Sequence, residues 1–350
     1  MAAITDHLAT LATGRVLTAL EAEDLFEIIL TGGADQAQIG AALAMVQVRR
    51  VNRAELLGAA RVMRKHALQV PTDGLQGVVL DTCGTGGTTK VFNISTVAAI
   101  VVAAAGDGRV HVAKHGNKSR TGRGSAEVLA RLGVNIHASP EVQGRCLREC
   151  NVCFSFAVAH HPAAKHAAGA RKSLGFPTLF NLLGPLCNPA RASHQLIGVF
   201  DPQFLEDMTI TLRELGSVGA VVLHGSADGR SPDQGGGIDE CSTIGPTLAY
   251  RLEKGTVAPL TFDAAREGVA TSTLDRLVAS DVEESAWIAR SILAGTSGPH
   301  ADIVALNAGL ALHIVGVASS HAEGVSQAYR AMADETARRT LETLARVSNE

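Results

Sequence analysis

Apolar residues recur at helical spacing along the first part of the chain. The repeats are Leu25, Ile28 and Ile29, then Ile39, Leu43 and Val46, and then Leu56, Leu57, Ala60 and Met63. Such spacing places apolar side chains on one face of a helix. The pair Gly32 and Gly33 separates the first repeat from the second. The pattern predicts a helical domain over residues 1–70.

From residue 78 onward, short continuous apolar runs replace the helical repeat. The runs cover residues 78–80, 110–113, 152–156, 196–200 and 218–224, and helical segments separate them. Strands that alternate with helices are typical of parallel sheets joined by crossover helices. The sequence therefore predicts an α/β domain with a mainly parallel central sheet over residues 75–350. A polar, glycine-rich loop at residues 225–237 follows the last run.

The first of two loops with candidate chemistry reads GTGG at residues 84–87. It precedes a helix whose start is marked by Asn93, Ser95 and Thr96. Glycine lets backbone amides approach an anion, and the helix N-terminus adds the positive end of its dipole. The spacings of a Walker loop and of a GxGxxG loop are both missing. The loop is suited to phosphate or diphosphate, and a tight turn before a capped helix is the alternative.

The second loop follows the apolar run at 110–113 and is rich in basic residues. These residues are Lys114, His115, Lys118, Arg120 and Arg123, interleaved with glycine. The formal net charge of the whole chain is only −3 at pH 7. Local cations in a nearly neutral protein indicate a small anion, because nucleic-acid-binding proteins have a broader basic surface. A solvated basic loop is the alternative.

The composition narrows the class of protein further. Of 350 residues, 46% are hydrophobic and 3% aromatic, which is typical of tightly packed helices on a parallel sheet. The six cysteines do not follow the spacing of a secreted disulfide framework, and the CxxC at 150–153 has no second CxxC for a zinc site. No signal peptide or membrane span is expected. We therefore expect a soluble cytoplasmic protein.

Several motifs occur in an order that resembles the anthranilate phosphoribosyltransferase family over nearly the whole chain. They are GTGG at 84–87, FNIST at 92–96, KHGN at 114–117, HPAAKH at 161–166, ARKSLG at 170–175, FNLLGPLCNP at 180–189 and IDE at 238–240. The resemblance implies a small helical domain, to which residues 162–184 return, and a larger α/β domain of the nucleoside phosphorylase and phosphoribosyltransferase type. It also implies a homodimer that transfers phosphoribosyl from phosphoribosyl pyrophosphate to anthranilate with Mg²⁺, in tryptophan biosynthesis.

The resemblance further implies the residues of each subsite. The phosphoribosyl pyrophosphate site would contain Gly84, Thr85, Gly86, Gly87, Asn93, Ser95, Thr96, Lys114 and Ser125. The acceptor site would contain Gly84, His115, Asn117, His161 and Arg171, whose guanidinium would meet the acceptor carboxylate. Ser95, Asp239 and Glu240 would hold Mg²⁺, which binds one or two carboxylates together with substrate phosphates. No general acid or base is assigned, because electrostatic stabilisation and positioning are the largest contributions expected to the rate enhancement.

Three loops depart from the family pattern near the expected site. Thr88 stands where the family has aspartate, the loop after KHGN is one residue short, and residues 230–234 resemble an insertion. These changes leave open a relative that uses another aromatic acceptor. Two further alternatives are a pyrimidine nucleoside phosphorylase, which shares this fold, and a non-catalytic nucleic-acid-binding relative, for which a basic stripe would be expected.

Overall fold

The computed structural model describes residues 3–87, 91–119, 122–234 and 236–350. Its N-terminal part is a helical bundle that contains α1 (Ile4–Ala12), α2 (Ala19–Leu30), α3 (Gln36–Val48) and α4 (Arg53–Lys65). Helices α2 to α4 each follow a capping residue, since the side chains of Thr18, Asp35 and Asn52 accept hydrogen bonds from backbone amides of the first turn. Gly32, with a φ of +83°, ends α2 as the glycine pair predicts.

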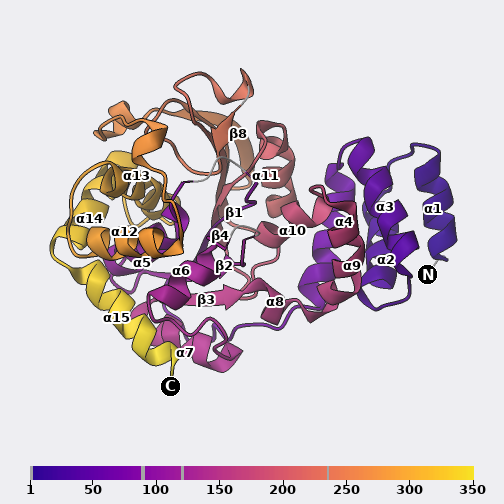
Figure 1. Ribbon diagram of the computed structural model, residues 1–350, viewed down its shortest axis with the longest axis horizontal. Coiled ribbons are helices and arrows are strands. Elements are labelled where there is room, and N and C mark those ends of the chain that lie inside the picture. Colours follow the sequence, from indigo (N-terminus) through magenta and orange to yellow (C-terminus); the bar gives the residue numbers. More distant parts are fainter. Residues whose placement is uncertain (1–2, 88–90, 120–121, 235) are drawn as a thin grey trace.

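A later segment packs onto this bundle. It consists of α8 (Ala157–His160), the 3-10 turn η1 (Pro162–Ala164), α9 (Lys165–Leu174) and α10 (Leu179–Leu186). Helix α9 packs against α2 and α3, and α10 packs against α4. Gln36 links α3 to α9, because its Nε2 donates to His166 O at 2.8 Å and its Oε1 accepts from Ala170 N at 2.7 Å. Figure 1 shows α1 to α4 and α9 grouped beside the larger part of the molecule. The domain boundaries expected from the sequence stay a prediction.

The larger part is built on a mixed sheet in the order β3-β2-β1-β4-β5-β7-β8, with β6 paired to β5. The strands are β1 (Val78–Gly84), β2 (Val110–Gly116), β3 (Val152–Phe156), β4 (His194–Gly198), β5 (Gly219–Ser226), β6 (Gly237–Ile238), β7 (Thr247–Glu253) and β8 (Thr256–Phe262). Strands β1 to β5 pair in parallel, whereas β6, β7 and β8 pair antiparallel. The apolar runs correspond to the parallel strands, with ends that differ by at most four residues and with exact agreement for β3. The β7–β8 hairpin is not predicted by the sequence pattern.

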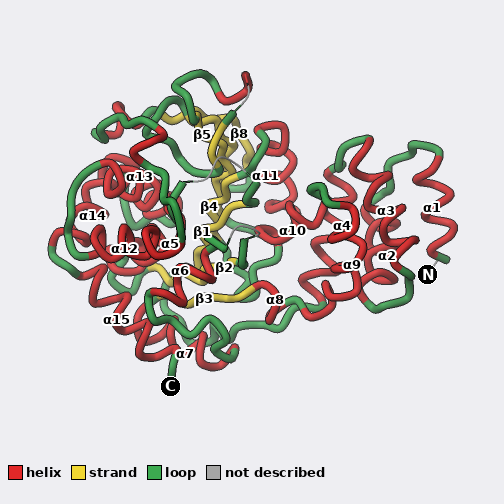
Figure 2. The backbone as a smooth tube through the Cα atoms, viewed as in Figure 1, coloured by secondary structure: helices red, strands yellow, loops and turns green. Residues whose placement is uncertain are grey.

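Helices cover both faces of this sheet, as Figure 2 shows. They are α5 (Ile94–Ala105), α6 (Ser125–Arg131), α7 (Pro140–Cys150), α11 (Leu205–Glu214), α12 (Val282–Leu293), α13 (Pro299–Ile314), α14 (His321–Ala333) and α15 (Thr336–Ser348). Successive residues of β5 point to opposite faces. Val221 joins the apolar core around α5, α13 and α14, and Val222 joins a second core shared by α10, α11 and the N-terminal bundle. One face of the sheet is therefore packed continuously with the bundle.

The described part of the chain contains no helix that is long and apolar enough to span a membrane. The six cysteines are free thiols buried in the protein. Cys150 is the last residue of α7 and Cys153 lies in β3, so the CxxC bridges a helix end and a strand.

Candidate active site

The first glycine loop lies at the carboxyl edge of the parallel strands. Gly84 is the last residue of β1, and the loop runs from there toward α5. Thr85 N donates to Gly198 O at 2.9 Å, which ties the loop to the end of β4. Gly86 and Gly87 have φ values of +64° and +94°, a backbone region that favours glycine. In open α/β sheets, the crevice outside the carboxyl ends of the strands is the usual place for a ligand.

Asp239 and Glu240 reach this loop from the connection that follows β6. Asp239 Oδ2 accepts a hydrogen bond from Gly86 N at 3.0 Å. Glu240 Oε1 accepts from Ser95 N, in the first turn of α5, at 3.1 Å. The approach requires a glycine at position 84, because a Cβ on Gly84 would overlap the carboxylate of Asp239. The structure thus brings together the three residues predicted to hold a metal.

Lys114 lies close to the carboxylate pair and is almost fully buried. Its Nζ donates to Thr82 O at 2.6 Å and to Ser95 Oγ at 3.3 Å. Burial lowers the pKa of Lys114, and the neighbouring carboxylates oppose this shift. Burial and the adjacent Asp239 raise the pKa of Glu240. A cation and two carboxylates therefore share one enclosed region, in which electrostatic interactions are stronger than in water.

The prediction that Lys114 and His115 belong to a loop is wrong, because both are among the last residues of β2. They are buried there since β1 supplies partners for them. Thr82 O accepts from Lys114 Nζ, and Asp81 Oδ1 accepts from His115 N at 3.0 Å. Burial in turn raises the pKa of Asp81. The positive charge of Lys114 is thus held at a fixed position in the sheet.

Asn93 connects the two glycine loops. It immediately precedes α5, but its side chain makes no capping hydrogen bond, so capping does not account for it. Its Nδ2 instead donates to Arg123 O, in the second loop, at 3.2 Å. Its Oδ1 accepts from Ser285 Oγ, on α12, at 2.8 Å. Ser285 therefore orients the amide of Asn93. The sequence reasoning missed Ser285, and the available signal was a serine among the apolar positions of residues 282–293.

Ser125 and Thr96 are two further residues predicted for the donor site. Ser125 begins α6, and its Oγ donates to Asn117 O at 3.4 Å. Thr96 is buried in the first turn of α5, and within the described residues its hydroxyl has no hydrogen-bond partner. Thr88 and Arg120 lie outside the described residues.

His115 and His161 lie against each other, with ring centroids 5.1 Å apart and ring planes at 60°. His115 Nδ1 lies 3.0 Å from Gly184 O, which places the proton on Nδ1. His115 Nε2 is then a buried acceptor that has no partner among the described residues. Burial lowers the pKa of His115 well below its usual range and lowers the pKa of His161 to about 4. Both rings are therefore neutral at physiological pH.

Arg171 lies on α9, and its guanidinium carbon is 4.8 Å from the ring centroid of Phe180 on α10. Burial lowers the pKa of Arg171, but a guanidinium remains charged. Stacking fixes its plane and leaves its N–H donors at the edge. Asn117 follows β2 and is exposed, and its Oδ1 accepts from Lys118 N at 2.8 Å. The convergence of Arg171 and Asn117 with the two histidines on one acceptor stays a prediction.

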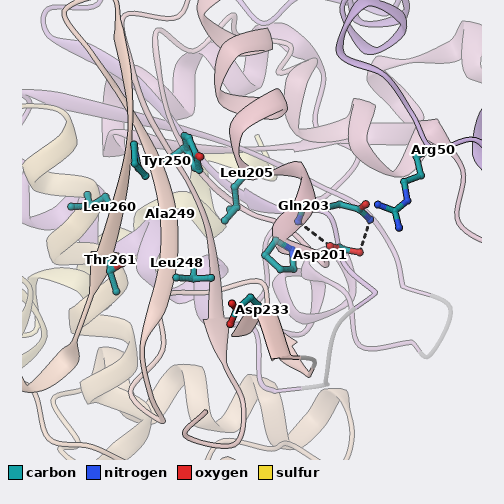
Figure 3. A pocket seen from close by; sticks show the side chains of 12 residues that line it. Arg50, Asp201, Gln203, Leu205, Asp233, Leu248, Ala249, Tyr250, Leu260 and Thr261 are labelled. Carbon is teal, nitrogen blue, oxygen red and sulfur yellow. Dashed lines mark hydrogen bonds between the residues drawn. The ribbon is translucent and has the colours of Figure 1, made fainter. Parts of the chain in front are cut away.

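An open groove of about 570 Å³ lies elsewhere, between the α3–α4 connection, the segment before α11 and the β7–β8 hairpin (Figure 3). Arg50, Asp201, Gln203 and Tyr250 are among its lining residues, and Gln203 Nε2 donates to Asp201 Oδ2 at 2.6 Å. Asp233, from the segment that resembles an insertion, also lines it. Within the described residues, none of those predicted for the active site lines this groove. The groove is thus separate from the candidate active site.

Two family models match the chain. Residues 5–67 match the helical bundle domain of the glycosyl transferase family, and residues 76–338 match its α/β domain. The protein is therefore a member of the class of glycosyl transferases that combine a helical bundle with an α/β domain.

Known relatives narrow this class. The anthranilate phosphoribosyltransferase of Methylorubrum extorquens (strain PA1) is 42% identical over 351 residues, which cover 100% of both chains. The crystal structure of anthranilate phosphoribosyltransferase (TrpD) from Thermus thermophilus has a TM-score of 0.88 and 33% identity, covering 98% of this chain and 99% of that chain. The Saccharomyces cerevisiae enzyme in complex with phosphoribosyl pyrophosphate and Mg has the same fold, with a TM-score of 0.85, 22% identity, and coverage of 99% and 98%. The chain belongs to the anthranilate phosphoribosyltransferase family, which confirms the resemblance and the fold class predicted from the sequence.

Proposed function

We propose that this enzyme transfers the phosphoribosyl group from phosphoribosyl pyrophosphate to anthranilate, giving N-(5-phosphoribosyl)anthranilate and pyrophosphate in tryptophan biosynthesis. The observation that carries the proposal is the meeting of the GTGG loop, the N-terminus of α5 and the pair Asp239 and Glu240 at one edge of the sheet. The carboxylates supply oxygen ligands for a metal-bound diphosphate, and the helix N-terminus adds the positive end of its dipole. Similarity to anthranilate phosphoribosyltransferases over the full chain supports anthranilate as the acceptor.

The oxygen donors at this edge fit Mg²⁺. The candidate ligands are the carboxylates of Asp239 and Glu240 and the hydroxyl of Ser95, all of which are hard ligands. Within the described residues, no group of three or more His, Cys, Asp or Glu could hold a metal by itself. Such an open set is typical of Mg²⁺ that is shared with substrate phosphates. When bound, Mg²⁺ would neutralise charge on the diphosphate. Mg in the S. cerevisiae complex, which shares this fold, adds support.

Charge separation is the main chemical problem of this reaction. Breaking the bond between ribose C1 and the diphosphate leaves positive charge on the sugar and negative charge on the leaving group. The buried ammonium of Lys114 favours the leaving group. Because His115 and His161 are neutral, these two rings add no positive charge beside the sugar. Preorganised groups of this kind are usually the largest catalytic term, followed by positioning.

Positioning of the acceptor would depend on Arg171 and His115. The stacked guanidinium of Arg171 suits a carboxylate, which it can bind through two parallel hydrogen bonds. The Nε2 lone pair of His115 can accept a hydrogen bond from the aromatic amine and orient its nitrogen toward ribose C1. The amine can lose its proton after the new bond forms, so this arrangement needs no dedicated general base.

We further propose a cytoplasmic homodimer held by its helical part, which the family resemblance implies. Leu20 on α2 and Val48 on α3 are 72% and 86% exposed and are candidate contact residues. Light scattering after size-exclusion chromatography would measure the mass, and a monomer at micromolar concentration would contradict the proposal.

The test of the activity is pyrophosphate release from phosphoribosyl pyrophosphate with a panel of acceptors. We expect kcat/KM for anthranilate to exceed that for other aromatic acids and nucleobases by about 100-fold or more, because a site that pairs polar groups discriminates strongly. Preference for a different aromatic acid would identify a relative with a changed acceptor. Phosphate-dependent cleavage of a pyrimidine nucleoside would instead indicate a nucleoside phosphorylase.

A further inference from the structure

Asn307 is a polar residue in the middle of an apolar, buried helix. Its neighbours in α13, Leu306 and Ala308, are fully buried, and Asn307 itself is 1% exposed. An amide in such a place destabilises the fold unless its hydrogen bonds are satisfied by the protein. The partners of Asn307 therefore indicate why a polar residue is present here.

Those partners lie in the loop that carries the carboxylate pair. Asn307 Oδ1 accepts from Cys241 N at 2.8 Å, and Asn307 Nδ2 donates to Cys241 O at 2.8 Å. The same Nδ2 donates to Ile303 O, within α13, at 2.9 Å. The side chain thus pairs with the backbone of Cys241 as a second peptide group would, and its orientation is fixed by its own helix.

Cys241 directly follows Glu240. The amide of the peptide bond between these two residues donates to Asn307, so Asn307 fixes the backbone immediately after Glu240. The next residue is also fixed, because Ser242 N donates to Thr247 Oγ1 at 2.9 Å. On the other side of the pair, the Glu240 carboxylate accepts from Ser95 N. The backbone after the carboxylates is therefore anchored on α13, 66 residues further along the chain.

We propose that Asn307 is a positioning residue that holds Asp239 and Glu240 in the geometry required for Mg²⁺ and diphosphate. The inference rests on the proposed function, since it concerns the same site. It goes beyond that function by assigning part of the diphosphate affinity to a side chain that touches neither the metal nor the substrate. Residues that orient metal ligands commonly change metal affinity or activity by about 10- to 100-fold when replaced.

The test uses calorimetric titration of pyrophosphate at several fixed Mg²⁺ concentrations, which needs no turnover. Asn307→Leu keeps the side-chain volume and removes both hydrogen bonds to Cys241. We expect it to weaken Mg²⁺-dependent pyrophosphate binding by about 10-fold or more. In steady-state kinetics, the KM for phosphoribosyl pyrophosphate should rise, and the KM for anthranilate should stay the same.

Leu310→Ala is the matched control, because Leu310 is buried on the same helix and its aliphatic side chain forms no hydrogen bonds. It should lower the melting temperature and leave pyrophosphate binding unchanged. If Asn307→Leu does not fold, Asn307→Ala carries the same comparison.

Wild-type affinity for pyrophosphate and Mg²⁺ in the folded Asn307 variant would overturn the inference. A wild-type protein that bound no pyrophosphate at any Mg²⁺ concentration would instead refute the proposed function, and the inference with it. If the enzyme does not use anthranilate as its acceptor but still binds pyrophosphate with Mg²⁺, the titration still decides whether Asn307 positions the carboxylates.

Discussion

Glu240 accepts a hydrogen bond from the backbone amide of Ser95 at 3.1 Å, so a carboxylate occupies the N-terminus of α5. The same relationship recurs in the glycine loop, where Asp239 accepts from Gly86 N at 3.0 Å. Both amides are donors that a phosphate group could otherwise use. A diphosphate that enters this crevice therefore meets two carboxylates, and a cation between them is needed to offset the repulsion.

The first prediction concerns this carboxylate pair. The double variant Asp239→Asn, Glu240→Gln should lose Mg²⁺-dependent turnover by at least about 100-fold, because the oxygen ligands of a divalent ion are weakened. Its stability at pH 8 should be equal to or above that of the wild type. The pKa of Glu240 is raised in the folded protein, so the ionised carboxylate lowers the free energy of unfolding as the pH rises above its unfolded-state pKa. Pyrophosphate release and thermal melts measure the two effects.

The control for this variant is Asp233→Asn, an exposed carboxylate in the preceding loop. It should leave both the Mg²⁺ dependence and the melting temperature unchanged. Full Mg²⁺-dependent activity in the double variant would show that Asp239 and Glu240 do not hold the metal.

The second prediction concerns Arg171. Arg171→Ala should raise the KM for anthranilate by about 10- to 100-fold, which corresponds to the ~1.5–3 kcal/mol of a lost hydrogen bond to a charged group. The KM for phosphoribosyl pyrophosphate should barely change. Lys172→Ala, at the exposed neighbouring position, is the control and should have no effect on either constant. A rise in the donor constant with an unchanged acceptor constant would reverse the assignment of the two subsites.

The sequence predicts those parts of the fold that carry a local signal. Strands β1 to β5 are buried on both faces and read as continuous apolar runs, so they are visible without any knowledge of their partners. Strand β8 is largely exposed, and Pro259 is one of its exposed positions. It therefore contains no continuous apolar run that would mark it as a strand. The β7–β8 hairpin is therefore stabilised by its pairing with β5, which a local pattern does not contain.

The candidate active site, like the fold, is predicted from the sequence only where the signal is local. The motifs indicate which residues gather at the carboxyl edge, since loops after parallel strands meet there. They do not indicate that Lys114 and His115 are buried in β2, because their partners, Thr82 and Asp81, lie on a different strand. Ser285 was missed for a related reason. Its contact with Asn93 joins positions 192 residues apart, and a lone serine in a helix carries no sign of that partner.

The third prediction tests the close approach of the carboxylate loop to β4. A Cβ on Gly198 would overlap the carbonyl of Asp239, so Gly198→Ala must displace the loop. We expect a large loss of donor affinity together with a loss of roughly 1–3 kcal/mol in the free energy of unfolding. Gly40→Ala is the matched control, because a Cβ there meets no atom within 4 Å and Gly40 lies within α3. That control should be neutral or should stabilise the protein by about 0.5–1 kcal/mol. Unchanged donor binding in Gly198→Ala would show that the loop position does not matter for the site.

The last prediction concerns the pH dependence of stability. Burial lowers the pKa of His161 to about 4, and the ring has an ordinary pKa of 6.5 when exposed in the unfolded chain. Between these two values the unfolded state binds more protons than the folded state, so the free energy of unfolding must fall as the pH decreases. The difference corresponds to about 3 kcal/mol as an upper estimate. His161→Phe removes this proton and should make the decrease shallower between pH 6.5 and pH 4, whereas His137→Phe, at an exposed position, should not. Urea unfolding at half-unit pH steps measures the slope directly. An identical slope in wild type and His161→Phe would show that His161 has the same pKa in the folded and unfolded states, which would contradict the lowering of its pKa by burial.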